Sequence, residues 1–328
     1  MIEPSGDRIY KDQTNPFFAL SIDASYSSSM SINRAEATRL ARICLPKILL
    51  SRRRQAETTT ADDAPSSSIE KYEQVSENNI KAKSLSRLWA GMGYIYQVTI
   101  TLSSSQTQTY NFIIKHVVPP TKSRRSFGDA RKATSYLIEA NFYEHVALTL
   151  IDEYDDNLSM PIPYHVERNN DTDEITICMS MLHGSPGYLE EKNIQAVLSW
   201  LATLHAATWG GGSVGSNNTK KKKKLDTYIS HQYIQPIGSY WHLNTRPNEH
   251  ESMSKRGWEG RLKLAARAID ERLRRDKMQC IIHGDAKDAN IMFDTSDEGG
   301  VRRVIVRMYD FQYCGMAPPS VRGCLVLI

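Results

Sequence analysis

The stretch IIHGDAKDANIMF, residues 281–293, decides how the rest of the chain is interpreted. Two apolar runs enclose a His, a Gly, two Asp, a Lys and an Asn. A surface turn does not need apolar flanks, and a buried strand disfavours so many polar groups. The stretch therefore predicts a loop that hydrophobic residues anchor and whose polar side chains point at a ligand.

The composition is that of a globular protein. The chain has 328 residues, 40% hydrophobic and 24% charged, which suits one large domain or two lobes. Its net charge of +4, without basic and aromatic residues interleaved, does not indicate a nucleic-acid partner. Five cysteines without a C-x-x-C pair indicate neither a disulfide framework nor a zinc knuckle. Without a secretory signal or a membrane span, the chain is expected to be cytoplasmic.

The first 68 residues are expected to form an extension ahead of the folded part. Residues 1–30 are polar and Ser-rich, which is typical of a leader without fixed structure. Residues 33–54 show helical spacing, and Pro46 is expected to break or kink that helix. The composition of residues 55–68 predicts a loop.

Residues 69–182 are expected to form a first lobe. Residues 93–102 and 110–118 predict two antiparallel strands around a polar turn. Residues 125–150 carry a broad apolar face at helical spacing, and residues 174–182 predict a further strand.

Residues 183–328 are expected to form a second lobe. Residues 194–209 and 258–277 predict amphipathic helices, the second rich in Arg and Lys near its end. Residues 210–224 form a Gly- and Lys-rich insertion, for which a solvated loop is favoured over an anionic partner. Because strands and helices are segregated along the chain, the pattern predicts an α+β fold rather than βαβ units.

A second apolar run follows residues 281–293. Pairing of the two runs suggests a role for the polar residues between them. Ile291–Phe293 and Val304–Tyr309 can pair as a hairpin across a Gly-containing turn. That pairing brings Asp310 near Asn290, with Asp285 on the loop just before. Oxygen ligands of this kind suit Mg²⁺, which takes one or two carboxylates and completes its shell with water and phosphate. Asp285 then remains to accept a proton from a substrate hydroxyl, as in phosphoryl transfer.

The motifs H-G-D-A-K-D-A-N (283–290) and Y-D-F-Q (309–312) resemble the catalytic and metal motifs of the aminoglycoside phosphotransferase and choline kinase superfamily. Within it they are most similar to the CHK kinase-like group, which includes ecdysteroid kinases. The resemblance implies a protein kinase-like two-lobed fold, with a small antiparallel N-lobe and a mainly helical C-lobe. It also implies ATP, Mg²⁺ and a small-molecule hydroxyl acceptor, with Asp285 as the catalytic base and Asn290 and Asp310 as metal ligands.

Further segments resemble the family in the family's own order. The segment GMGYIYQV (91–98) is similar to a nucleotide-binding Gly-rich turn, which implies a nucleotide contact at Gly91 and Gly93. FIIK (112–115) is similar to the strand that carries the phosphate-holding lysine, here Lys115. The following helix offers Glu139 as its partner, and Lys287 is either solvated or in contact with the γ-phosphate.

The chain also departs from the family's pattern. Only 18 residues follow Asp310, where the family continues with a long helical segment, so the C-lobe is expected to be truncated. A catalytically inactive nucleotide-binding protein or a truncated gene product therefore stays open as an alternative. A protein Ser/Thr kinase is disfavoured, because Gly284 stands where those enzymes have Arg and D-F-Q replaces D-F-G. His283 is expected to orient backbone, and a choline-like, steroid-like or aminoglycoside-like acceptor all remain open.

Overall fold

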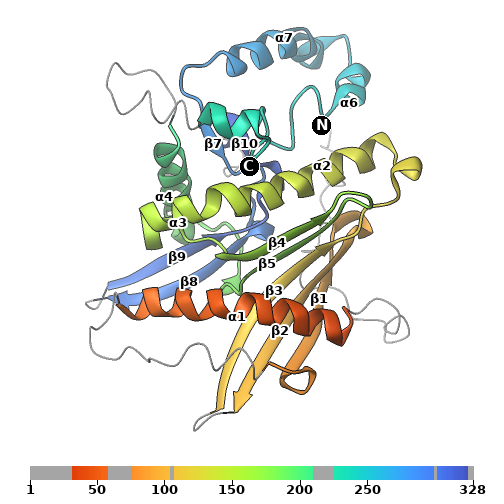
Figure 1. Cartoon of the computed structure of the whole chain (residues 1–328). Coiled ribbons are helices and arrows are strands. Elements are labelled where there is room, and N and C mark those ends of the chain that lie inside the picture. Colours follow the sequence, from red (N-terminus) through yellow and green to blue (C-terminus); the bar gives the residue numbers. More distant parts are fainter. Residues whose placement is uncertain (1–31, 58–74, 104–106, 210–224, 299–300, 324–328) are drawn as a thin grey trace, which may run out of the picture. The chain divides into compact units, whose positions relative to one another are not determined.

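The computed structural model describes residues 32–57, 75–103, 107–209, 225–298 and 301–323 (Figure 1). The expected leader (1–30), residues 58–68 of the expected loop and the 210–224 insertion lie outside the described residues. Among the described helices, none combines the length and the apolar character that a membrane span requires.

The first part of the described chain is built on one five-stranded antiparallel sheet. Its strands, in the spatial order β1-β2-β3-β5-β4, are β1 (Ile80–Arg87), β2 (Gly93–Ser103), β3 (Thr107–Val117), β5 (Glu174–Ser180) and β4 (Pro163–Asn169). The predicted hairpin is confirmed as β2 and β3, which pair along their whole length, with Ile95 opposite Lys115. The strand predicted at 174–182 is confirmed as β5.

Both faces of this sheet are covered. The helix α1 (Arg34–Glu57) packs on one face, where its apolar residues meet Phe112 and Ile114 of β3 (Figure 1). Because side chains alternate along a strand, Lys115 lies on the opposite face. The break expected at Pro46 does not occur, since the helix continues through it to Glu57, three residues into the predicted loop. Packing of both helix ends on the sheet explains why one missing hydrogen bond does not end the helix.

The helix predicted at 125–150 is confirmed, but it is not regular. It consists of α2 (Phe127–Phe142), one π-helical turn (Tyr143–Ala147) and α3 (Leu148–Tyr154). Ser126 caps its start, because Ser126 and Asp129 bond each other's backbone N–H groups. Phe142 ends α2 and Tyr143 begins the π turn, and both rings pack on Phe311.

The second part combines helices with short strands. Its elements are β6 (Ser185–Pro186), α4 (Glu191–Ala207), α6 (Pro247–Ser252), α7 (Gly257–Arg274), β7 (Cys280–Ile282), β8 (Ile291–Glu298), β9 (Val301–Met308), β10 (Gly315–Ala317) and α8 (Ser320–Gly323). The amphipathic helices predicted at 194–209 and 258–277 are confirmed as α4 and α7. The hairpin predicted after residue 290 is confirmed as β8 and β9, with Ile291 opposite Met308.

The helix α4 and the strand β7 pack against the stretch of residues 281–293. The apolar residues that α4 buries are Val197, Trp200, Leu201, Leu204 and Ala207. They belong to one core with Ile281 and Phe311 and with the inner face of the sheet. The loop that follows β7 is thereby held between the sheet, α2 and α4, as its apolar flanks predicted.

Candidate active site

Lys115 is the centre of a buried polar cluster. Its Nζ donates to Oε2 of Glu139 at 2.6 Å and to Oδ1 of Asp310 at 2.8 Å. The Lys115 and Glu139 side chains are 7% and 1% exposed, so solvent hardly screens this pair. The cluster joins a strand, a helix and the end of the β8–β9 hairpin, and it unites three of the residues that the sequence singled out.

Asp310 reaches this cluster because the chain after β9 is held tightly. The Tyr309 N–H donates to the carbonyl oxygen of Asn290 at 3.1 Å, which continues the hairpin by one bond. Asp310 itself has a φ of 70°, a left-handed conformation that is uncommon for a residue with a side chain. Phe311 is fully buried, and its ring stacks on Phe142 at 4.3 Å between centroids. This anchor keeps Asp310 in its unfavourable conformation, a feature that concentrates at functional sites.

In this cluster the Lys115 ammonium group pairs with two carboxylates, those of Glu139 and Asp310. Burial alone lowers the pKa of Lys115, but the charges of Asp310 and Glu139 outweigh burial and hold that pKa above its usual value. Burial raises the pKa of Glu139 to about 7, because the attraction of Lys115 only partly offsets it. For Asp310, burial is outweighed by the charge of Lys115, and the pKa of that carboxyl is lowered. Asp310 therefore stays ionised near neutral pH, as a metal ligand must.

The loop after β7 orients Asp285. Nδ2 of Asn290 donates to the backbone oxygen of Asp285 at 2.9 Å and to its carboxylate Oδ2 at 3.1 Å. Nζ of Lys287 lies 3.0 Å from the same Oδ2, and the Lys287 side chain is half exposed. The Asp285 carboxylate is therefore fixed by an amide on one side and paired with a movable cation on the other.

His283 and Gly284 hold the backbone of this loop in place. The Asp285 N–H donates to Nδ1 of His283, so the imidazole proton lies on Nε2, which donates to the carbonyl oxygen of Tyr309 at 3.0 Å. His283 thus holds backbone, as the sequence indicated. Gly284 has a φ of 84°, and a Cβ there would lie 1.8 Å from the carbonyl oxygen of Tyr313. Only glycine fits where these two loops cross.

The glycine turn connects β1 to β2. Gly91 and Gly93 have φ values of 72° and 127°. A Cβ at Gly93 would lie 2.0 Å from the carbonyl oxygen of His116, so the turn packs directly on the end of β3. The backbone therefore requires glycine at 93 and favours it at 91, and the contact of both with a nucleotide stays a prediction. Their position, next to the strand that carries Lys115, suits that contact.

The oxygen atoms needed for Mg²⁺ are present. Within the described part of the chain, Oδ1 of Asn290 and Oδ2 of Asp310 accept no hydrogen bond, although Asn290 is buried. An amide oxygen and a carboxylate oxygen are hard ligands of the kind that Mg²⁺ prefers. No group of three or more His, Cys, Asp or Glu residues among the described ones could hold a metal ion. The residues thus fit a Mg²⁺ that takes its other oxygens from phosphate and water, rather than a metal enclosed by the protein.

Gln312 is a positioning residue that sequence reasoning missed. Its Nε2 donates to Oδ1 of Asp310 at 2.7 Å, and its Oε1 accepts a hydrogen bond from Ser135 of α2 at 3.1 Å. The amide therefore links the D-F-Q segment to the helix that carries Glu139. The available signal was the Gln in D-F-Q, where protein kinases have a Gly without a side chain.

Sequence reasoning also missed two aromatic residues, Tyr240 and Tyr313, that lie beside Gly284 of the loop after β7. The Tyr240 N–H donates to the carbonyl oxygen of Gly284 at 3.2 Å, and its ring meets that of Tyr313 edge-on at 4.8 Å. The Arg246 guanidinium lies 4.3 Å from the Tyr240 ring centre. Arg131 and Arg246 also line a surface depression of about 540 Å³ between the starts of α2 and α6. These residues are far apart in sequence and form no motif, so only folding reveals them.

In this structure a lysine of an antiparallel sheet pairs with a helical glutamate. A loop with Asp and Asn follows, and then an Asp after a hairpin. This arrangement defines a kinase-like protein. The particular family follows from comparison with known proteins. The sequence profile of the ecdysteroid kinase-like family matches residues 91–321, which is more than half of the chain. The chain belongs to this family.

Among solved structures, the chain is similar to a thermostable mutant of the aminoglycoside phosphotransferase APH(4)-Ia in its apo form. The sequence identity is 11% and the TM-score 0.32, over 73% of this chain and 69% of that chain. No curated protein matches the chain.

Proposed function

We propose that this protein transfers the γ-phosphate of ATP, with Mg²⁺, to a hydroxyl group of a small molecule. The contact of buried Lys115 with both Glu139 and Asp310 carries the proposal. Enclosing a cation and two carboxylates costs free energy of desolvation, and a hydrophobic core would not need them. Such clusters of perturbed groups are typical of functional sites.

The nucleotide side of the proposed site lies between the lobes, which we place at residues 69–182 and 183–328. Lys115 would bind the α- and β-phosphates, and Glu139 would keep its ammonium group in place. The turn of Gly91 and Gly93 would bring backbone N–H groups close to the phosphates. Support comes from the position of the turn against the end of β3.

The metal would be held by Asn290 and Asp310. Bound Mg²⁺ supplies neutralisation of the phosphate charge during transfer. Gln312 would keep Asp310 aligned through its hydrogen bond, while Lys115 would exchange Asp310 for a phosphate oxygen.

Asp285 would orient the acceptor hydroxyl and take its proton. The hydroxyl oxygen forms a bond to the γ-phosphorus, the bond from that phosphorus to the β–γ bridging oxygen breaks, and ADP leaves. Lys287 would leave Asp285 for the γ-phosphate, which its exposed side chain permits. The proposed location is the cytoplasm, where ATP is abundant. The four described cysteines, all buried and without disulfides, are compatible with it.

A thermal melt with and without Mg·ATP tests the nucleotide site. A ligand at about 100 times its Kd stabilises the folded state by roughly 2.7 kcal/mol, so the melting temperature should rise. We expect the rise to vanish in Asp310→Ala and to persist in Asp294→Ala. Asp294 lies in the same hairpin, and among the described residues it pairs with Arg307 and with local backbone. An equal rise in Asp310→Ala would reject Asp310 as a ligand, and no rise in the unaltered chain would reject the nucleotide site.

Release of ADP with a panel of alcohols then tests transfer. Choline, ethanolamine, a sterol-like alcohol and an aminoglycoside represent the acceptor classes that the sequence left open. Nucleotide binding without ADP release from any of them would favour the catalytically inactive alternative. Phosphate transfer to a protein substrate instead would favour the protein kinase alternative.

A further inference from the structure

The side chain of Lys132 lies against the glycine turn. Lys132 belongs to α2, and its Nζ lies 4.4 Å from the ring centre of Trp89. Trp89 begins the short helical segment that leads into the turn. The neighbouring Leu88 and Met92 are buried in the core, so the segment that presents Trp89 is anchored on both sides. The contact therefore joins the glycine turn to the helix that carries Glu139.

Helical spacing places Lys132 on the same side of α2 as Glu139. The two residues are separated by about two helical turns, a rise of about 10 Å. Tyr136 lies between them on this side, and its ring centre is 5.2 Å from Nζ of Lys115. The side of α2 that carries Lys132 therefore faces the candidate site.

The sheet leads to the same place. The strand β3 continues from Lys115 to Val117, where a Cβ at Gly93 would meet its backbone. Going from Lys115 to the glycine turn along β3 thus corresponds to going from Glu139 to Lys132 along α2. The ammonium groups of Lys115 and Lys132 mark the two ends of a region that a triphosphate can fill.

No ion pair engages Lys132 within the described part of the chain, although the residue is half-buried. Asp129, one turn before it, bonds instead to Ser126 at the start of the helix. The adjacent Arg131 donates to the carbonyl oxygen of Thr245. Contact with the Trp89 ring is weaker than a hydrogen bond to an anion, so the Lys132 ammonium group can exchange it for a ligand.

The candidate site has no surplus of positive charge for a nucleotide. Lys115 and Lys287 pair with Asp285, Asp310 and Glu139, so the charges at best balance when Glu139 holds its proton. Mg·ATP brings further negative charge, and an anion binds more tightly where the local charge is positive. One more cation beside the glycine turn would supply that charge.

We propose that Lys132 is a further lysine that binds the outer phosphates of the nucleotide. Trp89 holds its ammonium group at the glycine turn while the site is empty. When Mg·ATP binds, the ammonium group leaves the ring and donates a charge-assisted hydrogen bond to a phosphate oxygen. This role rests on the phosphotransfer proposed above and adds a cation to its nucleotide site.

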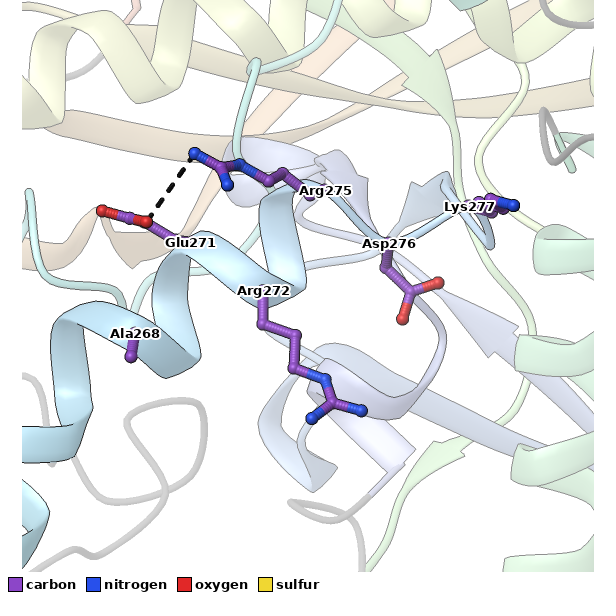
Figure 2. A pocket seen from close by; sticks show the side chains of 6 residues that line it. All are labelled: Ala268, Glu271, Arg272, Arg275, Asp276 and Lys277. Atoms are coloured by element: carbon purple, nitrogen blue, oxygen red, sulfur yellow. Dashed lines mark ion pairs between the residues drawn. The ribbon is translucent and has the colours of Figure 1, made fainter.

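Another group of basic side chains does not meet these conditions. Figure 2 shows an open depression of about 560 Å³ at the end of α7, lined by Ala268, Glu271, Arg272, Arg275, Asp276 and Lys277. Two of these six side chains are acidic, and Arg275 pairs with Glu271 at 3.8 Å. None of the residues singled out at the candidate site lines this depression. The outer phosphates are therefore assigned to Lys132 and not to this basic group.

Calorimetric titration with Mg·ATP and with AMP tests the proposal. Lys132→Gln should bind Mg·ATP about tenfold more weakly, because a hydrogen bond to a charged group contributes about that factor. AMP lacks the outer phosphates and should bind Lys132→Gln and the unaltered chain alike. If Lys132 only held the turn in shape, both nucleotides would lose the same factor, and that result would overturn the proposal.

Two further variants separate a local contact from general electrostatics. Lys122→Gln removes the same charge just before α2, where the ammonium group lies 3.2 Å from Asp173, and should leave the affinity for Mg·ATP almost unaltered. Lys132→Arg keeps the charge and should retain most of the affinity. If Lys122→Gln weakened binding as much as Lys132→Gln, the effect would be general and the proposal wrong.

The same titrations distinguish this proposal from phosphotransfer itself. If the unaltered chain bound no nucleotide, the proposed function would fail, and the role of Lys132 with it. If Asp310→Ala abolished Mg·ATP binding while Lys132→Gln bound like the unaltered chain, only the role of Lys132 would be rejected. The thermal melt of Lys132→Gln without nucleotide verifies that this variant folds.

Trp89 provides a separate readout. Departure of the ammonium group from its ring should change the indole emission when Mg·ATP is added. Trp89→Phe should lose this change and still bind, since Phe also offers a ring face to Lys132. Trp258→Phe, on α7, is the matched control and should retain the change. An emission change that persisted in Trp89→Phe would contradict release of Lys132 from Trp89.

Discussion

Local sequence pattern explains the position of Lys115, and the contacts of Lys115 support the proposed phosphate transfer. Alternation along β3 places it on the inner face of the sheet, and helical spacing turns Glu139 towards it. The resemblance of FIIK and of the following helix to the kinase-like family predicted that pair. Its second contact, with Asp310, joins residues 195 positions apart and required the whole fold.

At the same scale, Asp285→Asn should abolish most turnover and leave nucleotide binding intact. The amide keeps the shape and can still meet Asn290, but it cannot accept the hydroxyl proton. General base catalysis contributes about 10²–10⁴-fold, which is the expected loss in kcat. The measurement is ADP release with the best acceptor, together with calorimetric titration of Mg·ATP. An unaltered rate would exclude Asp285 as the base.

The raised pKa of Glu139 predicts a specific pH dependence of stability. Its pKa is about 7 in the folded protein against an ordinary value of 4.5. Below pH 4.5 both states hold the proton, and between pH 4.5 and 7 the unfolded chain releases it first. Across that window this group should lower the free energy of unfolding by up to about 1.4 kcal/mol per pH unit as pH rises.

Glu139→Gln removes this titration and should flatten the curve between pH 4.5 and 7. Urea unfolding at a series of pH values measures the difference between the two proteins. Glu191→Gln, an exposed substitution on α4, is the control and should leave the slope of the original chain. Parallel curves for the original chain and Glu139→Gln would contradict the assignment of the buried proton to Glu139.

At the scale of elements, Phe311 joins the end of the β8–β9 hairpin to α2. It stacks on Phe142 and meets Tyr143 edge-on, at the junction of α2 with the π turn. The hairpin was predictable because turn residues lie between two apolar runs. The π turn was not, since its pattern of apolar residues is the same as that of a regular helix.

Phe311→Ala should therefore both destabilise the protein and weaken its nucleotide site. Loss of a fully buried Phe side chain costs about 3–5 kcal/mol of unfolding free energy. Asp310, held in a left-handed conformation beside it, would lose its anchor. Denaturant unfolding and calorimetric binding of Mg·ATP measure the two effects. Phe127→Ala, at a side chain that is 70% exposed, should change stability by less than about 0.5 kcal/mol. Equal effects of the two substitutions would contradict this role of Phe311.

At the scale of the whole molecule, the sheet separates two hydrophobic cores. One lies between the sheet and α1, and the other includes α2, α4 and the floor of the candidate site. The sequence predicted the helix of residues 33–54 but treated it as part of an extension. The structure shows that α1 covers a face of the sheet, because β3 is apolar on both of its faces.

Leu45→Ala tests the separation of the cores. Leu45 of α1 is fully buried, so the substitution should cost about 2–5 kcal/mol of unfolding free energy. Turnover per folded molecule should not change, since the α1 core lies across the sheet from Lys115. Leu50→Ala, at a side chain that is 57% exposed, is the matched control and should leave the melt unaltered. A loss of turnover in folded Leu45→Ala would show that the two cores are coupled.

The sequence by itself determined the longer helices, the two hairpins and most of the polar residues at the candidate site, but it did not predict β1, β4, the π turn or Gln312. Periodicity, turn residues and motif order depend on neighbours along the chain, which are visible in the printed letters. The tertiary structure decided how those residues meet. The contacts of Lys115 with Asp310, of Gln312 with Ser135 and of Lys132 with Trp89 depend on how distant elements pack. Packing energies are sums over contacts between segments, and no single segment contains them.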